Sequence, residues 1–445
     1  MQLRKITPEQ SDKECYTSHG GLTLLGQAIR LAGLEQQLQA LGKCRGIGHG
    51  DIVKSYLGLL SIGKSDFEAA EGARKDDYFH AALGIERVAS APRLRQRLDE
   101  LALEYARVVD EATIVFLERI GAQVSPIWTG HVPLDLDLFP QDNSGTHKEG
   151  VSYTYKGHDG YGVMAAYLGV EGWCLSADLK PGSENGQLGF GFVLDRILPY
   201  ARRLTTRVLL MRLDSGHDAL ENRVRADTEE IDFIIKWNPR RDSAHEWLAY
   251  AEQLGHWADW DYPRPGKRVA TFTVYQTHRW QGREYTHRRV MRVIERRIDR
   301  KGQHLLVPEV EVEGWWTSLE HADAEIIALY RDHATSEQFH SEFKTDLDLE
   351  RLPSGKFDTN TLVMVLGTFV YNVLRWVGLS GLIGEHSPLR HPAKRRRVRT
   401  VMQELIYLAG KFYERGRRLW LRLSCHCPAF PAFQRVNALL AAASG

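Results

Sequence analysis

The sequence predicts an α/β protein of several domains, with a mixed β-sheet between helical terminal regions. Three observations predict this class. At 445 residues the chain is too long for one ordinary core, and its 43% hydrophobic and 26% charged residues are typical of a globular protein. Apolar residues follow helical spacing before residue 125. Between residues 130 and 237, strand-like runs alternate with helical ones.

The first 125 residues have the pattern of helices. Residues 20–41 carry apolar side chains at three-to-four spacing, and Asp51 is placed to cap a helix over 52–60. Ser90 and Pro92 open a long amphipathic segment, with Pro92 where the first turn of a helix tolerates it.

A strand pattern begins at residue 132, where VPLDLDLFP alternates between apolar and other side chains. The runs 161–169 and 173–180 flank the short turn Val170-Glu171-Gly172, which predicts a hairpin. A helical run, a buried strand over 207–213, a polar helix near 218–230 and a second buried strand over 231–237 follow. This order, three antiparallel strands and then two parallel ones, is that of a ribonuclease-H-like fold.

Beyond residue 243 the runs 268–280, 283–298 and 304–319 predict an inserted β-sheet, and helical signal then persists from His321 to the C-terminus. The net charge is only +1, yet residues 264–301 hold twelve Lys or Arg against three acidic residues, and residues 385–422 hold eleven against three. Two basic tracts with interleaved aromatic residues suit a polyanion that contacts the protein at several places. Solvated surface charge is the alternative interpretation.

Two aspartates lie at strand ends. Asp137 leaves the first predicted strand and Asp214 the fourth, and these strands are neighbours in the predicted sheet, so the carboxylates should converge. Close carboxylates raise each other's pKa unless a cation lies between them, and Mg²⁺ accepts oxygen ligands while leaving positions for phosphate and water. A structural capping role is the ordinary alternative for a single strand-end aspartate.

A third carboxylate is expected on a helix after the insertion. Tyr330, Glu337 and Lys344 are seven residues apart, which on a regular helix places them on one stripe to within about 20°. A carboxylate between a phenol and an ammonium suits metal binding flanked by phosphate contacts, whereas a solvated helix face is the alternative.

The spacing Tyr330-x2-His333-x3-Glu337-x6-Lys344 resembles the Y-x2-R-x3-E-x6-K signature of DDE transposases of bacterial insertion sequences. LDLDLFP and RLDSGHD resemble the first two acidic motifs of that family, so the resemblance covers about residues 130–360. It implies a ribonuclease-H-like catalytic core with a β-rich insertion. His333 stands where the signature has arginine, so either a protonated His333 or a neighbour such as Arg331 is expected to contact DNA phosphate.

The resemblance implies a transposase that binds the terminal inverted repeats of an insertion sequence and cuts and transfers DNA strands. Its two metal ions, Mg²⁺ or Mn²⁺ in its place, would be held by Asp137, Asp214 and Glu337. Asp135 is the alternative first ligand and Asp142 a weaker one, and Asp218 and Glu342 are expected beside the ligands. DNA contacts are expected from Tyr330, His333, Lys344, Arg288 and Arg289.

Double-stranded DNA, as element ends and target, is the expected partner, and a homodimer is expected on DNA. The expected regions are 1–125 (helical, DNA-end recognition), 126–242 (first part of the catalytic core), 243–320 (basic β-rich insertion), 321–385 (second part of the core, with the glutamate helix) and 386–445 (basic and helical). The rival functions are a Mg²⁺-dependent nuclease or resolvase without strand transfer, and an inactive domesticated DNA-binding relative.

Cellular location is predicted from three features. The five cysteines are scattered, the N-terminus lacks the apolar run of a secretory signal, and the most apolar stretch, 362–383, is interrupted by Asn372 and Arg375. Together with the resemblance, these features predict a cytoplasmic, nucleoid-associated bacterial protein in which 362–383 is a buried helix and not a membrane span.

Overall fold

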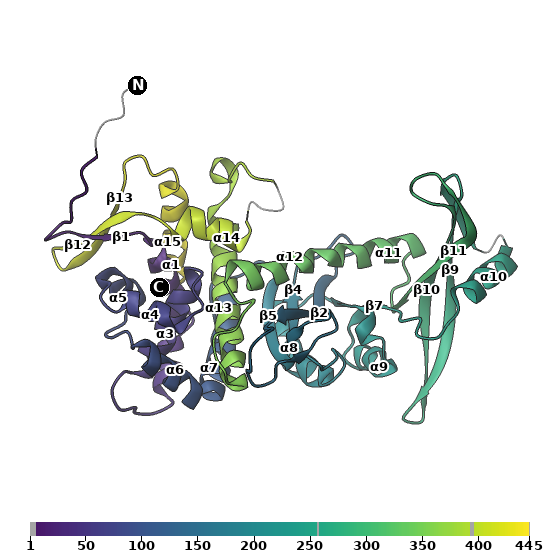
Figure 1. The fold of residues 1–445 in the computed structure, drawn as a ribbon, viewed down its shortest axis with the longest axis horizontal. Helices are drawn as coiled ribbons and strands as arrows, with labels where there is room; N and C mark the ends of the chain where they lie inside the picture. The colour runs from purple at the N-terminus through teal and green to yellow at the C-terminus, as the bar shows by residue number, and fades with distance from the viewer. Residues whose placement is uncertain (1–5, 256–257, 392–395, 445) are drawn as a thin grey trace, which may run out of the picture.

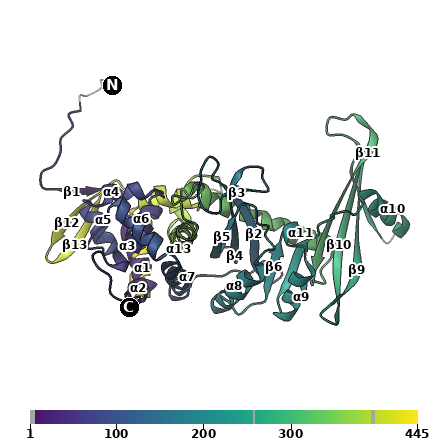
Figure 2. The same cartoon turned by 60° about the horizontal axis from the view of Figure 1, so that its bottom comes forward.

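The computed structural model describes residues 6–255, 258–391 and 396–444. The protein is elongated, with three parts along its length (Figure 1). Helices from both ends of the chain form one end, a mixed sheet lies in the middle, and long strands form the other end, an arrangement that Figure 2 also shows.

The N-terminal part is helical, as predicted. It comprises α1 (Leu22–Leu31), α2 (Leu34–Gln39), α3 (His49–Ser61), α4 (Ala70–Ala73), α5 (Asp77–Leu83), α6 (Ala91–Glu100) and α7 (Ala102–Arg119). The run 20–41 forms two helices because Gly33, at φ +66°, takes a left-handed conformation that ends the first. Asp51 is not the predicted cap: α3 begins two residues before it, and its carboxylate accepts the backbone N–H groups of Glu86 and Arg87.

Five strands form the middle of the molecule: β2 (Val132–Asp142), β4 (Asp159–Leu168), β5 (Trp173–Pro181), β6 (Leu209–Leu213) and β7 (Asp232–Lys236). They lie in the order β5-β4-β2-β6-β7. β4 is antiparallel to β5 and β2, whereas β2, β6 and β7 are mutually parallel. The predicted hairpin and parallel pair are therefore confirmed. The short β3 (Ser152–Tyr153) pairs with the start of β4, and α8 (Phe190–Leu204) and α9 (Leu220–Thr228) precede β6 and β7.

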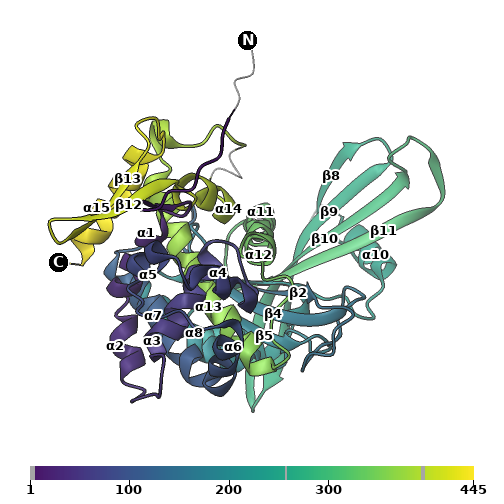
Figure 3. The same ribbon diagram turned by 60° about the vertical axis from the view of Figure 1, so that its left-hand side comes forward.

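The insertion is not a separate sheet, which corrects the sequence prediction. It comprises α10 (Ala244–Leu254), β8 (Asp259–Arg264), β9 (Lys267–Trp280), β10 (Arg283–Ile298) and β11 (His304–Thr317). β11 pairs antiparallel with β7, so the inserted strands continue the central sheet, and their far ends extend well beyond it (Figure 3). The sequence analysis missed α10, in which only Ala251 is fully buried, although Trp247, Leu248, Ala251 and Leu254 follow helical spacing and pack against the core.

The region after residue 320 is mainly helical, with α11 (Asp323–Arg331), α12 (Ser336–Ser341), α13 (Phe357–Gly381), α14 (Val398–Val401) and α15 (Phe430–Ala443). The prediction of an all-helical C-terminal region is wrong at β12 (Gly410–Arg415) and β13 (Arg418–Leu423), which form a hairpin that pairs with β1 (Cys15–Thr17). Gly416 and Arg417, both at positive φ, make its two-residue turn.

The long helix α13 packs between the helical part and the sheet. It contacts α7 on one side and β5 on another, and Asn372 exchanges hydrogen bonds with the backbone of Cys174 in β5 at 2.7 and 2.9 Å. Within the described residues α13 alone is long and apolar enough to cross a membrane, but 89% of its most apolar window is buried inside the protein. The prediction of a buried helix over 362–383 is confirmed.

Candidate active site

Two of the three predicted carboxylates come together at the middle of the sheet. Asp137 lies in β2, and Asp214 follows the end of β6, the parallel neighbour of β2. Burial, and after it the nearby charge of Asp214, raises the pKa of Asp137 to about 6. Asp137 does not lie at a strand end as predicted, because β2 continues to Asp142, but the parallel pairing of β2 with β6 still places one carboxylate within the electrostatic reach of the other.

Asp214 is held by the turn that follows it. Its carboxylate accepts the N–H of Gly216 at 3.1 Å and lies 2.6 Å from Nδ1 of His217, whose side chain is buried. Burial opposes ionisation, but His217 and Gly216 outweigh it and lower the pKa of Asp214. Of the two carboxyl groups, Asp214 is thus the one that stays ionised more readily.

Asp135, the alternative first ligand, is occupied by the protein's own cations. Arg212 donates to its two carboxylate oxygens at 2.6 and 2.7 Å, and Nδ1 of His333 lies 3.2 Å from the carboxylate. Burial alone would raise the pKa of Asp135, but these two partners lower it to about 2. Arg212 also donates to the carbonyl of Leu329 in α11. This cluster of Asp135, Arg212 and His333 connects β2, β6 and the helical segment after the insertion.

The expectation that His333 contacts DNA is not supported by its position. Its side chain is only 9% exposed and faces Asp135. Burial would lower the pKa of His333, but Asp135 raises it above its ordinary value. The histidine therefore balances an internal carboxylate. Arg331, the alternative named above, ends α11 and is exposed.

The predicted single stripe of Tyr330, Glu337 and Lys344 is not formed, because the helix is irregular. A 3₁₀ turn over Asp332–Thr335 separates α11 from α12, and a π turn over Glu342–Asp346 follows α12. Each change of helix type shifts the angular position of the residues after it. The seven-residue spacing therefore does not keep the three side chains in line.

Each member of the expected stripe has a different environment. Burial, then Asp214 and Asp137, raises the pKa of Tyr330, so its phenol lies within the electrostatic reach of the acid pair. Glu337 is exposed, one turn before His340, whose Nδ1 lies 3.7 Å from Asp137 Oδ2. The helix that carries Glu337 thus lies against β2, but the Glu337 carboxylate does not join Asp137 and Asp214. Across the described residues, no group of three or more His, Cys, Asp or Glu is gathered for a metal ion.

Lys344 does not project freely from the helix. Its ammonium donates to the carbonyl of Pro140 at 2.7 Å and lies 3.1 Å from the carboxylate of Glu350. The side chain is 26% exposed, so it joins the π turn to the end of β2 while keeping some contact with solvent.

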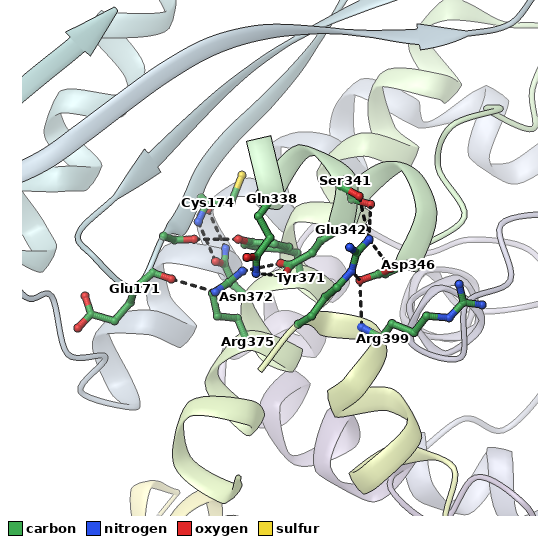
Figure 4. Close-up of polar contacts among 12 residues, drawn as sticks. Glu171, Cys174, Gln338, Ser341, Glu342, Asp346, Tyr371, Asn372, Arg375 and Arg399 are labelled. Carbon is green, nitrogen blue, oxygen red and sulfur yellow. Dashed lines mark hydrogen bonds and ion pairs between the residues drawn. The ribbon is translucent and has the colours of Figure 1, made fainter. Parts of the chain in front are cut away.

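Glu342 is a structural anchor, which corrects the expectation that it lies beside a metal ligand. It is fully buried and paired with Arg375 of α13, and Gln338 donates to it at 3.2 Å (Figure 4). On the same turn, Asp346 accepts the backbone N–H of Arg399 at 3.1 Å, and it also pairs with Arg397. These pairs fix the end of the segment that carries Glu337.

Two further predicted acids lie away from the pair. Asp142, at the exposed end of β2, accepts the N–H of Ser144 at 2.8 Å. Asp218 pairs with Arg223 at 3.1 Å and accepts the N–H of Asn238 at 2.9 Å. Both carboxylates are therefore used in local structure, and neither supports the pair of Asp137 and Asp214 directly.

The two arginines expected to contact the DNA backbone are largely buried. Arg288 donates to the carbonyls of Leu319 and His321 at 2.8 and 2.7 Å and pairs with Asp323 at the start of α11. Arg289 is 6% exposed and lies over the rings of three tryptophans, at 4.6 to 5.0 Å from their centroids; these are Trp237, Trp247 and Trp316. Both guanidinium groups are therefore engaged inside the protein, which corrects that expectation.

Two histidines at the site were missed from the sequence. His217 holds Asp214, and the His340 ring stacks on Phe139 with centroids 4.4 Å apart beside Asp137. Burial lowers the pKa of His340 to about 3, so it is neutral there. His217 lies three residues after Asp214, a spacing that could have found it, whereas His340 reaches Asp137 from a distant part of the chain and has no such local signal.

The site can be tested for its fit to a divalent metal ion. Asp137 and Asp214 supply hard oxygen donors, which Mg²⁺ prefers. Burial and then the charge of Asp214 raise the pKa of Asp137, and a cation between the two carboxylates would offset both effects. No Lys or Arg among the described residues forms an ion pair with either carboxylate. The pair therefore fits such an ion, whereas Glu337 would have to turn inward to reach it.

Comparison with known proteins assigns the chain to a family. The family model described as "Transposase DDE domain group 1" matches residues 4–444. The chain belongs to this transposase family. A comparison with curated proteins finds no match. Among solved structures, a piggyBac transposase synaptic complex with hairpin DNA, determined by cryo-EM, is similar at 9% identity and a TM-score of 0.39, over 87% of this chain and 80% of that one.

Proposed function

We propose that this family member is a DNA transposase of a bacterial insertion sequence, which cleaves and transfers DNA strands at the acid pair of Asp137 and Asp214. The observation that carries the proposal is that these two carboxylates converge without a lysine or arginine partner among the described residues, whereas the neighbouring Asp135 is paired with Arg212. Two close carboxylates inside a protein repel each other, and a ligand that supplies positive charge removes that penalty. Membership of the transposase family makes DNA phosphate chemistry the natural use of such a site.

Asp137 and Asp214 would hold a divalent ion, Mg²⁺ or Mn²⁺, and Glu337 would complete the site. When bound, such ions activate water or a 3′-hydroxyl and stabilise the oxygens that enter and leave the phosphorus. Glu337 is one helical turn from His340, which already contacts Asp137. A rotation of the exposed Glu337 side chain is therefore the smallest change that would bring its carboxylate to the pair. The strand order β5-β4-β2-β6-β7 supports a ribonuclease-H-like core for this chemistry.

The chain's own residues would orient the site. His217 fixes one oxygen of Asp214, which leaves the other oxygen to face the ligand. The Tyr330 phenol lies within the electrostatic reach of both carboxylates and would donate to a substrate oxygen. Lys344 and Arg331 would attract phosphates, while the helical N-terminal region would recognise the terminal repeats as part of a homodimer on DNA.

The proposal is tested with single substitutions in the purified protein and a supercoiled plasmid that carries the element ends. Asp137→Asn, Asp214→Asn and Glu337→Gln should each reduce Mg²⁺-dependent cleavage by about 10³-fold or more, because each removes a charge that binds the metal. Their affinity for DNA should stay close to that of the unaltered protein. Asp142→Asn is the matched control, since that carboxylate lies at the exposed end of the same strand.

Cleavage at the normal rate by any of the three variants would reject the role of that residue. Normal cleavage by both Asp137→Asn and Asp214→Asn would reject the site. Joining of the cut ends to a second plasmid distinguishes a transposase from a nuclease that stops after cleavage.

A further inference from the structure

A hairpin tip lies beside the acid pair and has no role in the account above. Between β3 and β4, the N–H of Thr154 donates to the carbonyl of His158 at 2.9 Å, and the N–H of Gly157 donates back to Thr154 at 3.0 Å. Gly157 has φ +87°, a conformation that other residues rarely adopt, so glycine allows this tight turn. Tyr155 and Lys156 form the tip itself.

Two observations place the tip at the acid pair. The hydroxyl of Tyr155 donates to the carbonyl of Leu138, the residue after Asp137, at 3.0 Å. Burial and then the charges of Asp137 and Asp214 raise the pKa of Tyr155 to about 12. The phenol thus lies in the field of both carboxylates, and its hydrogen bond fixes the ring against β2.

The tip also forms one wall of a pocket of about 820 Å³. The second wall is the loop after β5, and the third is the turn after β6, which brings Asp214 and His217 to the pocket. Four glycines line it, namely Gly157, Gly182, Gly186 and Gly216. At Gly182 and Gly186 a Cβ would collide with the carbonyls of Ser152 and Gly160 or with the His217 ring, so glycine allows these walls to pack closely. Cavities of roughly 300–1,000 Å³ hold small ligands, so one or two nucleotides fit here, whereas a duplex does not.

The chemistry of the tip suits a nucleotide. The Tyr155 side chain is 63% exposed although its hydroxyl is anchored, so a face of the ring remains available. The Lys156 ammonium lies 5.5 Å from the centroid of that ring. No carboxylate in the described part of the chain forms an ion pair with it, unlike Arg292 and Arg296 of β10, which pair with glutamates of β11.

We propose that the pocket behind Tyr155 and Lys156 binds an unpaired segment of the DNA strand next to the bond that is cut. The Tyr155 ring stacks on a base, and Lys156 contacts the adjoining phosphate, since aromatic side chains and nearby cations are how proteins hold single strands. This inference rests on the proposed function and adds a subsite that distinguishes an unpaired strand end from a closed duplex.

The test measures binding by fluorescence anisotropy in metal-free buffer, so that cleavage does not interfere. The two probes are a duplex of mixed sequence with a short single-stranded tail and the same duplex with blunt ends. The unaltered protein should bind the tailed probe more tightly. Tyr155→Ala and Lys156→Ala should lose roughly tenfold in affinity for the tailed probe and little for the blunt one. Tyr155→Phe should keep the preference, because it keeps the ring.

Tyr262→Ala is the matched control, since Tyr262 is 68% exposed but lies on β8, at the far edge of the sheet. Lys156→Ala should also reduce the slope of log affinity against log salt on the tailed probe by about 0.7, the value for one contact to a single strand.

Equal affinity of Tyr155→Ala and the unaltered protein for the tailed probe would overturn the subsite and leave the proposed function in place. The same loss in Tyr262→Ala would overturn it too, as a non-specific effect. If the unaltered protein bound neither probe, the proposed function itself would fall.

Discussion

Asp135 and Asp137 lie two residues apart on one strand, and their surroundings are opposite. Arg212 and His333 surround Asp135 and lower its pKa to about 2, whereas burial and Asp214 raise the pKa of Asp137 to about 6. Both side chains are largely buried, at 6% and 23% exposed. Burial therefore does not distinguish them. The difference is whether the protein itself supplies the balancing charge.

This comparison separates structure from function within one motif. A carboxylate that is neutralised internally contributes to the fold, because removing its partner would leave a buried charge. A carboxylate that is not neutralised destabilises the protein in the absence of a bound cation and becomes favourable when a cation binds. The sequence LDLDLFP contains both kinds, and only their neighbours in space tell them apart.

The largest expected effect concerns the neutralised carboxylate. Arg212→Met should lower the free energy of unfolding by about 3–5 kcal/mol, because it removes one member of a buried pair and leaves Asp135 charged. Chemical denaturation at neutral pH measures this loss. The double variant Asp135→Asn, Arg212→Met should recover part of it, since no unpaired charge then remains. A double variant that is no more stable than Arg212→Met would show that the pair does not carry the effect.

The pH dependence of this pair has a definite sign. The pKa of Asp135 in the folded protein is about 2, below the roughly 4 of an unfolded chain, so the pair stabilises the protein above pH 4 and this contribution is lost as pH falls towards 2. The stability difference between the unaltered protein and Arg212→Met should shrink over the same range.

A smaller effect of opposite sign is expected at the second carboxylate. Asp137→Asn should raise the free energy of unfolding by about 1–3 kcal/mol above pH 7 in the absence of metal, because it removes a buried charge that pairs with no lysine or arginine among the described residues. The folded pKa of Asp137 lies above its unfolded value, so the unaltered protein loses stability as pH rises from about 4 through 6, and the variant should not. Thermal denaturation across this range measures the effect.

Magnesium provides the control for Asp137→Asn. A saturating concentration, about 100 times the dissociation constant, should stabilise the unaltered protein by about 2.7 kcal/mol and the variant by much less. Equal stabilisation of both proteins would place the ion elsewhere.

The same comparison explains how much could be predicted from the sequence. The strands that carry Asp137 and Asp214 were predictable because alternation and buried apolar runs are local patterns, and their parallel pairing brings the two positions side by side although Asp137 lies inside its strand. The pairing of Asp135 with Arg212 was not predictable, because Arg212 lies within an apolar run 77 residues further along the chain. The position of Glu337 was missed for another reason: a seven-residue spacing assumes a regular helix, and the 3₁₀ and π turns break it.

The smallest expected effect concerns substitutions of the basic residues in the insertion. Residues 264–301 are strongly basic in sequence, but Arg296 of β10 pairs with Glu309 and Glu311 of β11. By contrast, Arg283 at the β9–β10 turn is exposed and forms no ion pair with the residues the structure describes. We expect Arg296→Gln to change stability by less than about 1 kcal/mol, as is usual for pairs near the surface.

DNA binding should distinguish Arg283 from Arg296 in the same way that metal binding should distinguish Asp137 from Asp135. Arg283→Gln should reduce the slope of log affinity against log salt by about 0.9, the value for one contact to duplex DNA, whereas Arg296→Gln should leave the slope nearly unchanged. A guanidinium that already pairs with two carboxylates gains little free energy from binding a phosphate, because it must first give up an equivalent contact. A larger change for Arg296→Gln than for Arg283→Gln would mean that the β10–β11 pairs open on DNA, and that internal neutralisation does not mark a structural charge in this part of the protein.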